Sequence, residues 1–146
     1  MENTDIEILL VEDNRSDAEL TIRALNKGKL ANSIVHLQNG ALAIDFLFGQ
    51  KEFAQRDTNN KPKVILLDLK MPKVDGLEVL KTIKSNDHTK KIPVVILTSS
   101  KENPDIEKAY ALGANSYIVK PVDFDGFAKA ITDLGFYWLL LNQNPF

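Results

Sequence analysis

Five short apolar runs, separated by longer amphipathic segments, constrain the fold of this 146-residue chain most strongly. They span residues 6–11, 34–37, 64–67, 94–97 and 117–119. The first, third and fourth runs are nearly continuous in Val, Ile and Leu and do not alternate with polar residues. Such runs are typical of strands that helices cover on both faces. The sequence therefore predicts a central parallel β-sheet.

The segments between these runs carry apolar residues at helical spacing. Examples are Ala18, Ile22 and Leu25 in the first segment, Leu77, Leu80 and Ile83 in the third, and Phe124, Phe127, Ile131, Leu134 and Trp138 after the last run. Parallel strands need crossover connections, so strands alternating with helices predict a doubly wound α/β fold with a βα unit repeated five times. Residues typical of element boundaries agree with this order. They are Pro62 and Pro93 before strands, Asn103 and Pro104 at a helix start, and Gly113 at a helix end.

Composition narrows the class of protein. The length fits one domain, and no apolar stretch approaches the roughly 18 residues of a membrane span. A net charge of −2 gives no general attraction for nucleic acid. The chain has no Cys, and His36 and His88 lack metal-ligand spacing, so we expect them at the surface or a strand edge. Residues 1–5 are acidic and do not resemble a secretory signal, which predicts a cytoplasmic protein.

Chemically active side chains stand where the predicted strands end. They are Glu12 and Asp13 after the first run, Asp68 after the third, Thr98, Ser99 and Ser100 after the fourth, and Lys120 with Pro121 after the fifth. In an open α/β sheet, ligands bind at the carboxyl ends of the strands. We therefore expect three carboxylates, a hydroxyl and an ammonium to converge on one edge of the sheet.

Three crowded carboxylates repel one another unless a cation neutralises them, and hard oxygen ligands suit Mg²⁺ better than zinc. Beside such an ion a carboxylate can act as a nucleophile toward phosphorus, and a Lys can offset the charge on the phosphoryl oxygens. Each residue also has a plainer explanation, such as Asp13 as a helix cap or Lys120 as a solvated loop residue. Their joint occurrence at strand ends, in this order, favours a site for an aspartyl phosphate.

In these motifs the chain resembles the receiver domains of two-component response regulators. The matching segments are 8–13 (ILLVED), 66–76 (LLDLKMPKVDG), 93–100 (PVVILTSS) and 117–121 (YIVKP), and the resemblance covers about 5–134. It implies a flavodoxin-like sheet of order 2-1-3-4-5 flanked by five helices. It also implies a single receiver domain over 1–146, with its core at about 5–134 and an aromatic helical tail at 135–146.

The resemblance implies a role for each site residue. Asp68 would be the phosphoacceptor, and Mg²⁺ would bind Glu12, Asp13, Asp68 and the backbone carbonyl of Lys70. Lys120 would pair with one phosphoryl oxygen.

The same resemblance implies a switch. The Thr98 hydroxyl would move toward another phosphoryl oxygen, and Tyr117 would turn inward into the space that Thr98 vacates. The Lys120–Pro121 bond resembles the cis peptide usual in the family. The output surface would then be formed by the fourth helix, the fifth strand and the fifth helix.

Two features resemble a narrower group, the stand-alone regulators paired with bacterial phytochrome kinases. They are the long polar segment 49–63, read as a mobile loop or a short extra turn, and the aromatic run 136–141. That run covers more than one helix face, which leaves open whether it packs within the chain or forms a homodimer.

The first function hypothesis is a non-enzymatic switch that a sensor histidine kinase phosphorylates on Asp68 and that signals by protein contacts, without binding DNA. The alternative is a phosphorelay intermediate that passes the phosphoryl group to a histidine phosphotransfer protein. A dehalogenase-like phosphatase is disfavoured, because Lys70 stands where its second acid would lie. A flavodoxin is disfavoured, because residues 12–15 (EDNR) would repel the FMN phosphate.

Overall fold

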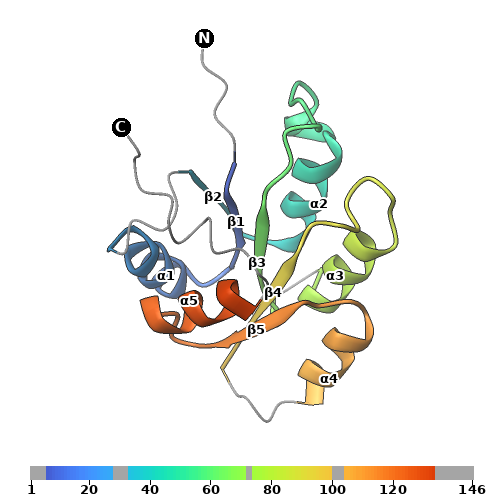
Figure 1. The fold of residues 1–146 in the computed structure, drawn as a ribbon. Helices are drawn as coiled ribbons and strands as arrows, with labels where there is room; N and C mark the ends of the chain where they lie inside the picture. Colours follow the sequence, from blue (N-terminus) through green and yellow to red (C-terminus); the bar gives the residue numbers. More distant parts are fainter. Residues whose placement is uncertain (1–5, 28–32, 72–73, 100–103, 134–146) are drawn as a thin grey trace.

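The structure, a computed structural model, describes residues 6–27, 33–71, 74–99 and 104–133. Its strands are β1 (Ile8–Val11), β2 (Ile34–Leu37), β3 (Val64–Asp68), β4 (Val94–Thr98) and β5 (Ser116–Val119). Its helices are α1 (Arg15–Lys27), α2 (Gly40–Phe48), α3 (Gly76–Lys84), α4 (Pro104–Ala111) and α5 (Phe124–Asp133), with a 3-10 turn η1 (Lys51–Phe53). The strands form one parallel sheet of order β2-β1-β3-β4-β5 (Figure 1). The predicted fold and strand order are confirmed.

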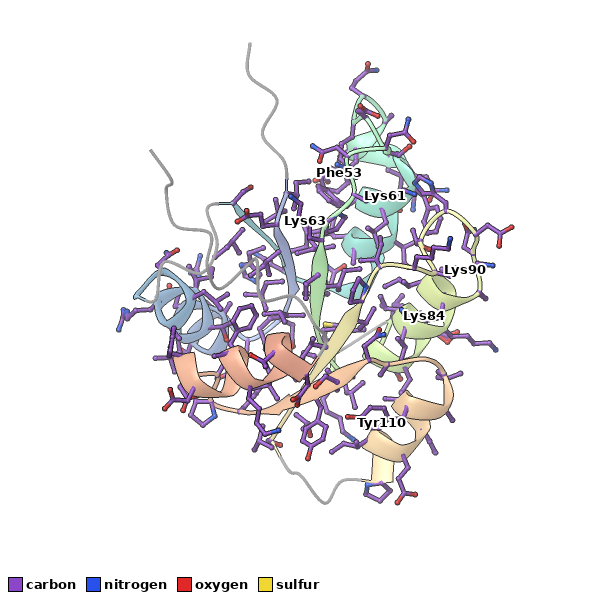
Figure 2. The ribbon with its side chains drawn as sticks, in the orientation of Figure 1. Phe53, Lys61, Lys63, Lys84, Lys90 and Tyr110 are labelled. Atoms are coloured by element: carbon purple, nitrogen blue, oxygen red, sulfur yellow. The ribbon has the colours of Figure 1, made fainter. Side chains whose placement is uncertain are left out.

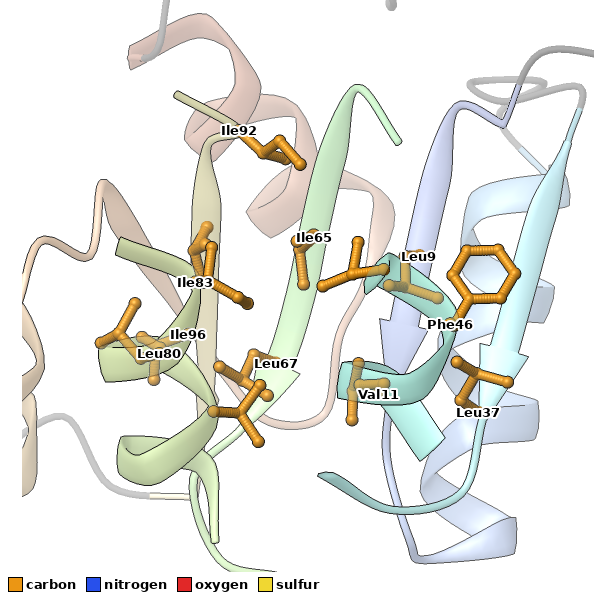
Figure 3. Packing of buried hydrophobic residues seen from close by; sticks show 14 of the residues in the cluster. Leu9, Val11, Leu37, Phe46, Ile65, Leu67, Leu80, Ile83, Ile92 and Ile96 are labelled. Carbon is orange, nitrogen blue, oxygen red and sulfur yellow. The ribbon is translucent and has the colours of Figure 1, made fainter. Parts of the chain in front are cut away.

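Side chains that alternate along each buried strand build two cores, one on each face of the sheet. Leu9, Val11, Ile65 and Leu67 pack beneath α2 and α3 in the larger core (Figure 3). Their neighbours in the strands face α1 and α5, where Phe127 lies at the centre of the second core. Burial on both faces explains why these strands lack polar residues.

Element boundaries follow local hydrogen bonding. Asn39 caps α2, and its side chain accepts a hydrogen bond from the Leu42 amide at 2.8 Å. Asp75 caps α3 in the same way through the Glu78 amide. Pro104 begins α4, and Gly113 follows that helix with a positive φ of 112°, as predicted for a helix end. The predicted cap Asn103 lies outside the described residues.

The polar segment between α2 and β3 is packed against α2 and contains an extra turn. Its η1 turn places Phe53 edge-on to Phe46 of α2, with ring centroids 5.2 Å apart. Arg56 lies 3.9 Å above the Phe46 ring and donates hydrogen bonds to the carbonyls of Phe46 and Asn60. Figure 2 shows Phe53 at the amino ends of the central strands. The short extra turn, one of the two forms expected for this segment, is present.

Three other expectations concern the two histidines, a membrane span and the C-terminal tail. His36 lies on the edge strand β2, half-buried, and His88 is half-buried before β4. Among the residues described, no helix is long and apolar enough to cross a membrane. Leu134, Trp138 and the tail 135–146 lie outside the described residues, so the packing of the tail and the homodimer remain predictions.

Candidate phosphoacceptor site

The register of the parallel strands brings the predicted residues to one edge of the sheet. Asp68 and Thr98 are the last residues of β3 and β4, one residue beyond the predicted ends of these strands. Asp68 pairs in register with Leu97, and Thr98 pairs with Val119. Glu12 and Lys120 directly follow β1 and β5. The sheet therefore delivers four of the predicted side chains to the carboxyl ends of four adjacent strands.

The three predicted acids form a compact cluster. One oxygen from each of Glu12, Asp13 and Asp68 lies within 4.8 Å of the other two. Glu12 is completely buried, Asp68 is 4% exposed, and Asp13 is exposed. The Lys70 amide donates to Asp68 Oδ1 at 3.2 Å, and the Asn14 amide donates to Glu12 Oε2 at 3.1 Å. Hydrogen bonds thus fix the buried carboxylates of Glu12 and Asp68, and the cluster is open to solvent on the side of Asp13.

Lys120 extends its ammonium into this cluster. Its Nζ lies 2.9 Å from Glu12 Oε1, 3.0 Å from Asp17 Oδ2 and 3.4 Å from Asp68 Oδ2. The Lys120–Pro121 peptide is cis, as the resemblance implied. Burial disfavours the charged ammonium, but the bonds from Glu12 and Asp17 outweigh it, so the pKa of Lys120 is raised. Lys120 is therefore a cation held among acids.

The pKa of the buried Glu12 carboxyl is also raised, because burial disfavours its charged form. Burial raises its pKa to about 7, against the lowering effect of Lys120 and with a further increase from the nearby Asp68. Glu12 Oε1 is enclosed and accepts no hydrogen bond of normal geometry, so Lys120 is its only counter-charge among the described residues. An added cation would relieve this excess of negative charge.

The donor set fits a divalent metal ion. Three carboxylate oxygens converge, Glu12 also has an oxygen buried without a hydrogen bond, and hard divalent cations prefer carboxylate ligands. The side chain of Lys70 turns away from the cluster, because its Nζ pairs with Asp105 of α4 at 2.8 Å. This pair raises the pKa of Lys70 and lowers that of Asp105. The role predicted for the Lys70 carbonyl remains a prediction.

The two predicted switch residues occupy different environments. Thr98 is buried beside the acids, and its carbonyl accepts a 2.6 Å hydrogen bond from the Lys120 amide. Tyr117 of β5 is 37% exposed, and its ring meets that of Tyr110 of α4 edge-on, with centroids 6.2 Å apart. Tyr117 thus faces outward in this structure, toward α4.

Asp17 is a site residue that the sequence reasoning missed. It lies in the first turn of α1, where acidic residues commonly favour the helix dipole. The available signal was its spacing of four residues from Asp13 in the first turn of the helix that follows the acidic pair, which begins at Arg15. That spacing alone does not reveal a contact with Lys120, which lies 103 residues later.

This fold and acidic edge define a class of protein that the sequence comparison also recovers. The chain belongs to the response regulator receiver domain family, whose model matches residues 8–132. Proteins of this class are phosphoacceptor signalling switches, and their acceptor implies a phosphodonor partner such as a histidine kinase.

Within that family the chain is similar to phytochrome-linked regulators. The solved bacteriophytochrome response regulator AtBRR is 52% identical, with a TM-score of 0.86, and the match covers 97% of this chain and 100% of that one. Response regulator Rcp1 of Synechocystis is 37% identical, over 90% of this chain and 88% of Rcp1.

Two further solved structures bear on the site. An Mn²⁺-bound form of Rcp1 is 35% identical with a TM-score of 0.74, over 97% of this chain and 99% of that one. The phosphorylated cyanobacterial phytochrome response regulator RcpA is 35% identical with a TM-score of 0.76, over 98% of this chain and 100% of that one. These comparisons do not favour the alternative of a relay intermediate.

Proposed function

We propose that this chain is a single-domain response regulator that accepts a phosphoryl group on Asp68 in a Mg²⁺-dependent reaction. The observation that carries the proposal is the buried Asp68 carboxylate, with the Lys120 ammonium 3.4 Å away and two further acids beside it. AtBRR, whose whole chain is covered by the match, supports action as a single receiver domain.

In the proposed reaction an oxygen of Asp68 bonds to phosphorus while the bond from phosphorus to the donor's imidazole nitrogen breaks. The imidazole leaves with the electron pair and takes up a proton from solvent. Lys120 holds one phosphoryl oxygen by a charge-assisted hydrogen bond, and the Thr98 hydroxyl donates to another. Glu12, Asp13, Asp68 and the Lys70 carbonyl would hold Mg²⁺. When bound, this ion would offset the charge on the transferred phosphoryl group.

The proposed output is a change of protein contacts at the surface formed by α4, β5 and α5. Movement of Thr98 toward the phosphoryl group draws Tyr117 inward and removes its edge-on contact with Tyr110. That change alters the shape of an exposed surface. The downstream protein recognises the altered surface.

The proposed phosphodonor is a phytochrome-like sensor histidine kinase in the cytoplasm, where ATP is available to the kinase. The phytochrome link rests on the similarity to the bacteriophytochrome regulator AtBRR and the cyanobacterial phytochrome regulator RcpA, and the metal on the similarity to the Mn²⁺-bound form of Rcp1.

Intact mass after incubation with acetyl phosphate tests the acceptor. We expect one phosphoryl adduct in wild-type protein with Mg²⁺, none with EDTA, and none in Asp68→Asn, which keeps the shape of the side chain but removes the nucleophile. Asp13→Asn is a second variant that spares the acceptor and is expected to raise the Mg²⁺ concentration required. An unchanged adduct in Asp68→Asn would show that the acceptor lies elsewhere.

A further inference from the structure

Asp17 of α1 contacts the site but belongs to none of the roles assigned above. We propose that Asp17 is a positioning residue, which holds the Lys120 ammonium in the orientation needed to receive a phosphoryl oxygen on Asp68. This inference rests on the proposed function and adds one residue to it. Asp17 itself does not contact the reacting atoms.

The backbone of Asp17 is held by hydrogen bonds that do not involve Lys120. Its amide donates to Asn14 Oδ1 at 2.9 Å, and its carbonyl accepts from the Thr21 hydroxyl at 2.9 Å. Thr21 is itself buried. A carboxylate anchored in this way can orient a flexible Lys side chain, whose four-carbon chain has a large conformational entropy.

The ammonium has three N–H donors, and three carboxylates surround it. Glu12 and Asp17 are the near partners, at 2.9 and 3.0 Å, and Asp68 is the far one at 3.4 Å. The hydrogen bond to Asp17 and the short ion pair with Glu12 hold the ammonium from two sides, and Asp68 lies at the longer distance on a third. A phosphoryl oxygen on Asp68 would accept from the ammonium on that third side without displacing Glu12 or Asp17.

Asp17 also has a possible role in helix stability, because an acid in the first turn interacts favourably with the helix dipole. Glu78 offers a matched comparison for that effect. It is also the third residue of its helix, its amide donates to a capping Asp75, and its carbonyl accepts from Thr82, while its side chain is exposed. Glu78→Ala removes the same helix charge without touching Lys120.

The test compares phosphorylation rates by acetyl phosphate in the full chain with Mg²⁺. We expect Asp17→Ala to be roughly tenfold slower than wild type, because an unpositioned ammonium forms its bond only part of the time. Asp17→Asn keeps an oxygen that accepts from Nζ and should stay within about twofold of wild type. Glu78→Ala should match wild type. In a Lys120→Met background, Asp17→Ala should cause no further loss.

A second readout does not depend on phosphorylation. NMR relaxation of the Lys120 ammonium in metal-free protein should show greater motion in Asp17→Ala, and wild-type order in Asp17→Asn and Glu78→Ala. The inference is overturned if the ammonium keeps its order in Asp17→Ala, or if Asp17→Ala slows the Lys120→Met protein equally. If wild-type protein takes up no phosphoryl group, the proposed function fails, and the NMR result alone decides whether Asp17 positions Lys120.

Discussion

At the scale of single residues, three hydrogen bonds hold Lys84, a cation outside the site. Its Nζ donates to the carbonyls of Lys90 and Ile92 at 3.1 and 2.7 Å, and to Asn115 Oδ1 at 3.1 Å. Figure 2 shows Lys84 and Lys90 on the right of the molecule, near α3 and the loop that follows it. Lys84 therefore joins the end of α3 to the segments that lead into β4 and β5. Burial lowers its pKa.

Replacing Lys84 by Met removes these three hydrogen bonds while keeping an unbranched side chain. We expect the free energy of unfolding, from urea denaturation at pH 7, to fall by about 2 kcal/mol. Lys81→Met, an exposed position on the same helix, should change it by less than about 0.5 kcal/mol. Equal effects of the two variants would show that the three bonds contribute nothing.

The same variant has a predictable pH dependence. The pKa of Lys84 is lower in the folded protein than its ordinary 10.5, so between these two values the unfolded chain binds more protons. Stability from this group therefore rises as the pH increases toward 10.5. The stability difference between wild type and Lys84→Met should widen in that window, as urea midpoints at successive pH values would show.

At the scale of elements, the start of α3 is packed directly on the end of β3. A Cβ added to Gly76 would lie 2.4 Å from the Asp68 carbonyl oxygen and 2.5 Å from the Leu69 Cα. Both are backbone atoms and cannot move aside. The absence of a side chain at this first position of α3 is thus what lets the helix approach Asp68.

Gly76→Ala should therefore destabilise the fold by about 3 kcal/mol and slow phosphorylation of Asp68, because α3 or the acceptor must shift. The control is Gly126→Ala in α5, where the nearest atom is Asp123 Oδ1 at 3.1 Å. That change should stay within about 1 kcal/mol of wild type, since Ala favours helix. Thermal unfolding and acetyl phosphate labelling of both variants test the contrast.

At the scale of the whole molecule, the carboxyl edge of the sheet concentrates negative charge. Glu12, Asp17 and Asp68 surround the Lys120 ammonium there, and Asp13 lies beside Glu12 and Asp68. This arrangement stores repulsion in the metal-free protein. A divalent cation that binds only the folded chain would relieve it and stabilise the entire domain.

Mg²⁺ at 100 times its dissociation constant should raise the free energy of unfolding by about 2.7 kcal/mol, and EDTA should reverse the gain. Asp13→Asn should reduce this increase at a given Mg²⁺ concentration. Asp87→Asn, an exposed acid in the loop before β4, should leave it unchanged. Thermal melts with and without Mg²⁺ measure all three, and equal gains in both variants would contradict the assigned ligands.

The sequence by itself determined the parallel sheet, the five βα units and the polar residues that meet at the carboxyl edge of the sheet. Runs of Val, Ile and Leu report burial on both faces, and Glu12, Asp68, Thr98 and Lys120 are readable because each stands at or beside a strand end. Strand limits were less accurate: Asp68 and Thr98 prove to be strand residues, because the pairing of β3 with β4 and of β4 with β5 continues through them.

Only the tertiary structure decided how the charged side chains pair. Asp17 is an ordinary first-turn acid in the sequence, but the packing of α1 beside the end of β5 brings it to Lys120. Lys70 turns outward to Asp105, and Lys84 collects acceptors from two distant segments. Periodicity reports which face of an element is buried. The partner of a long charged side chain depends instead on which other elements lie within its reach, and folding alone sets that.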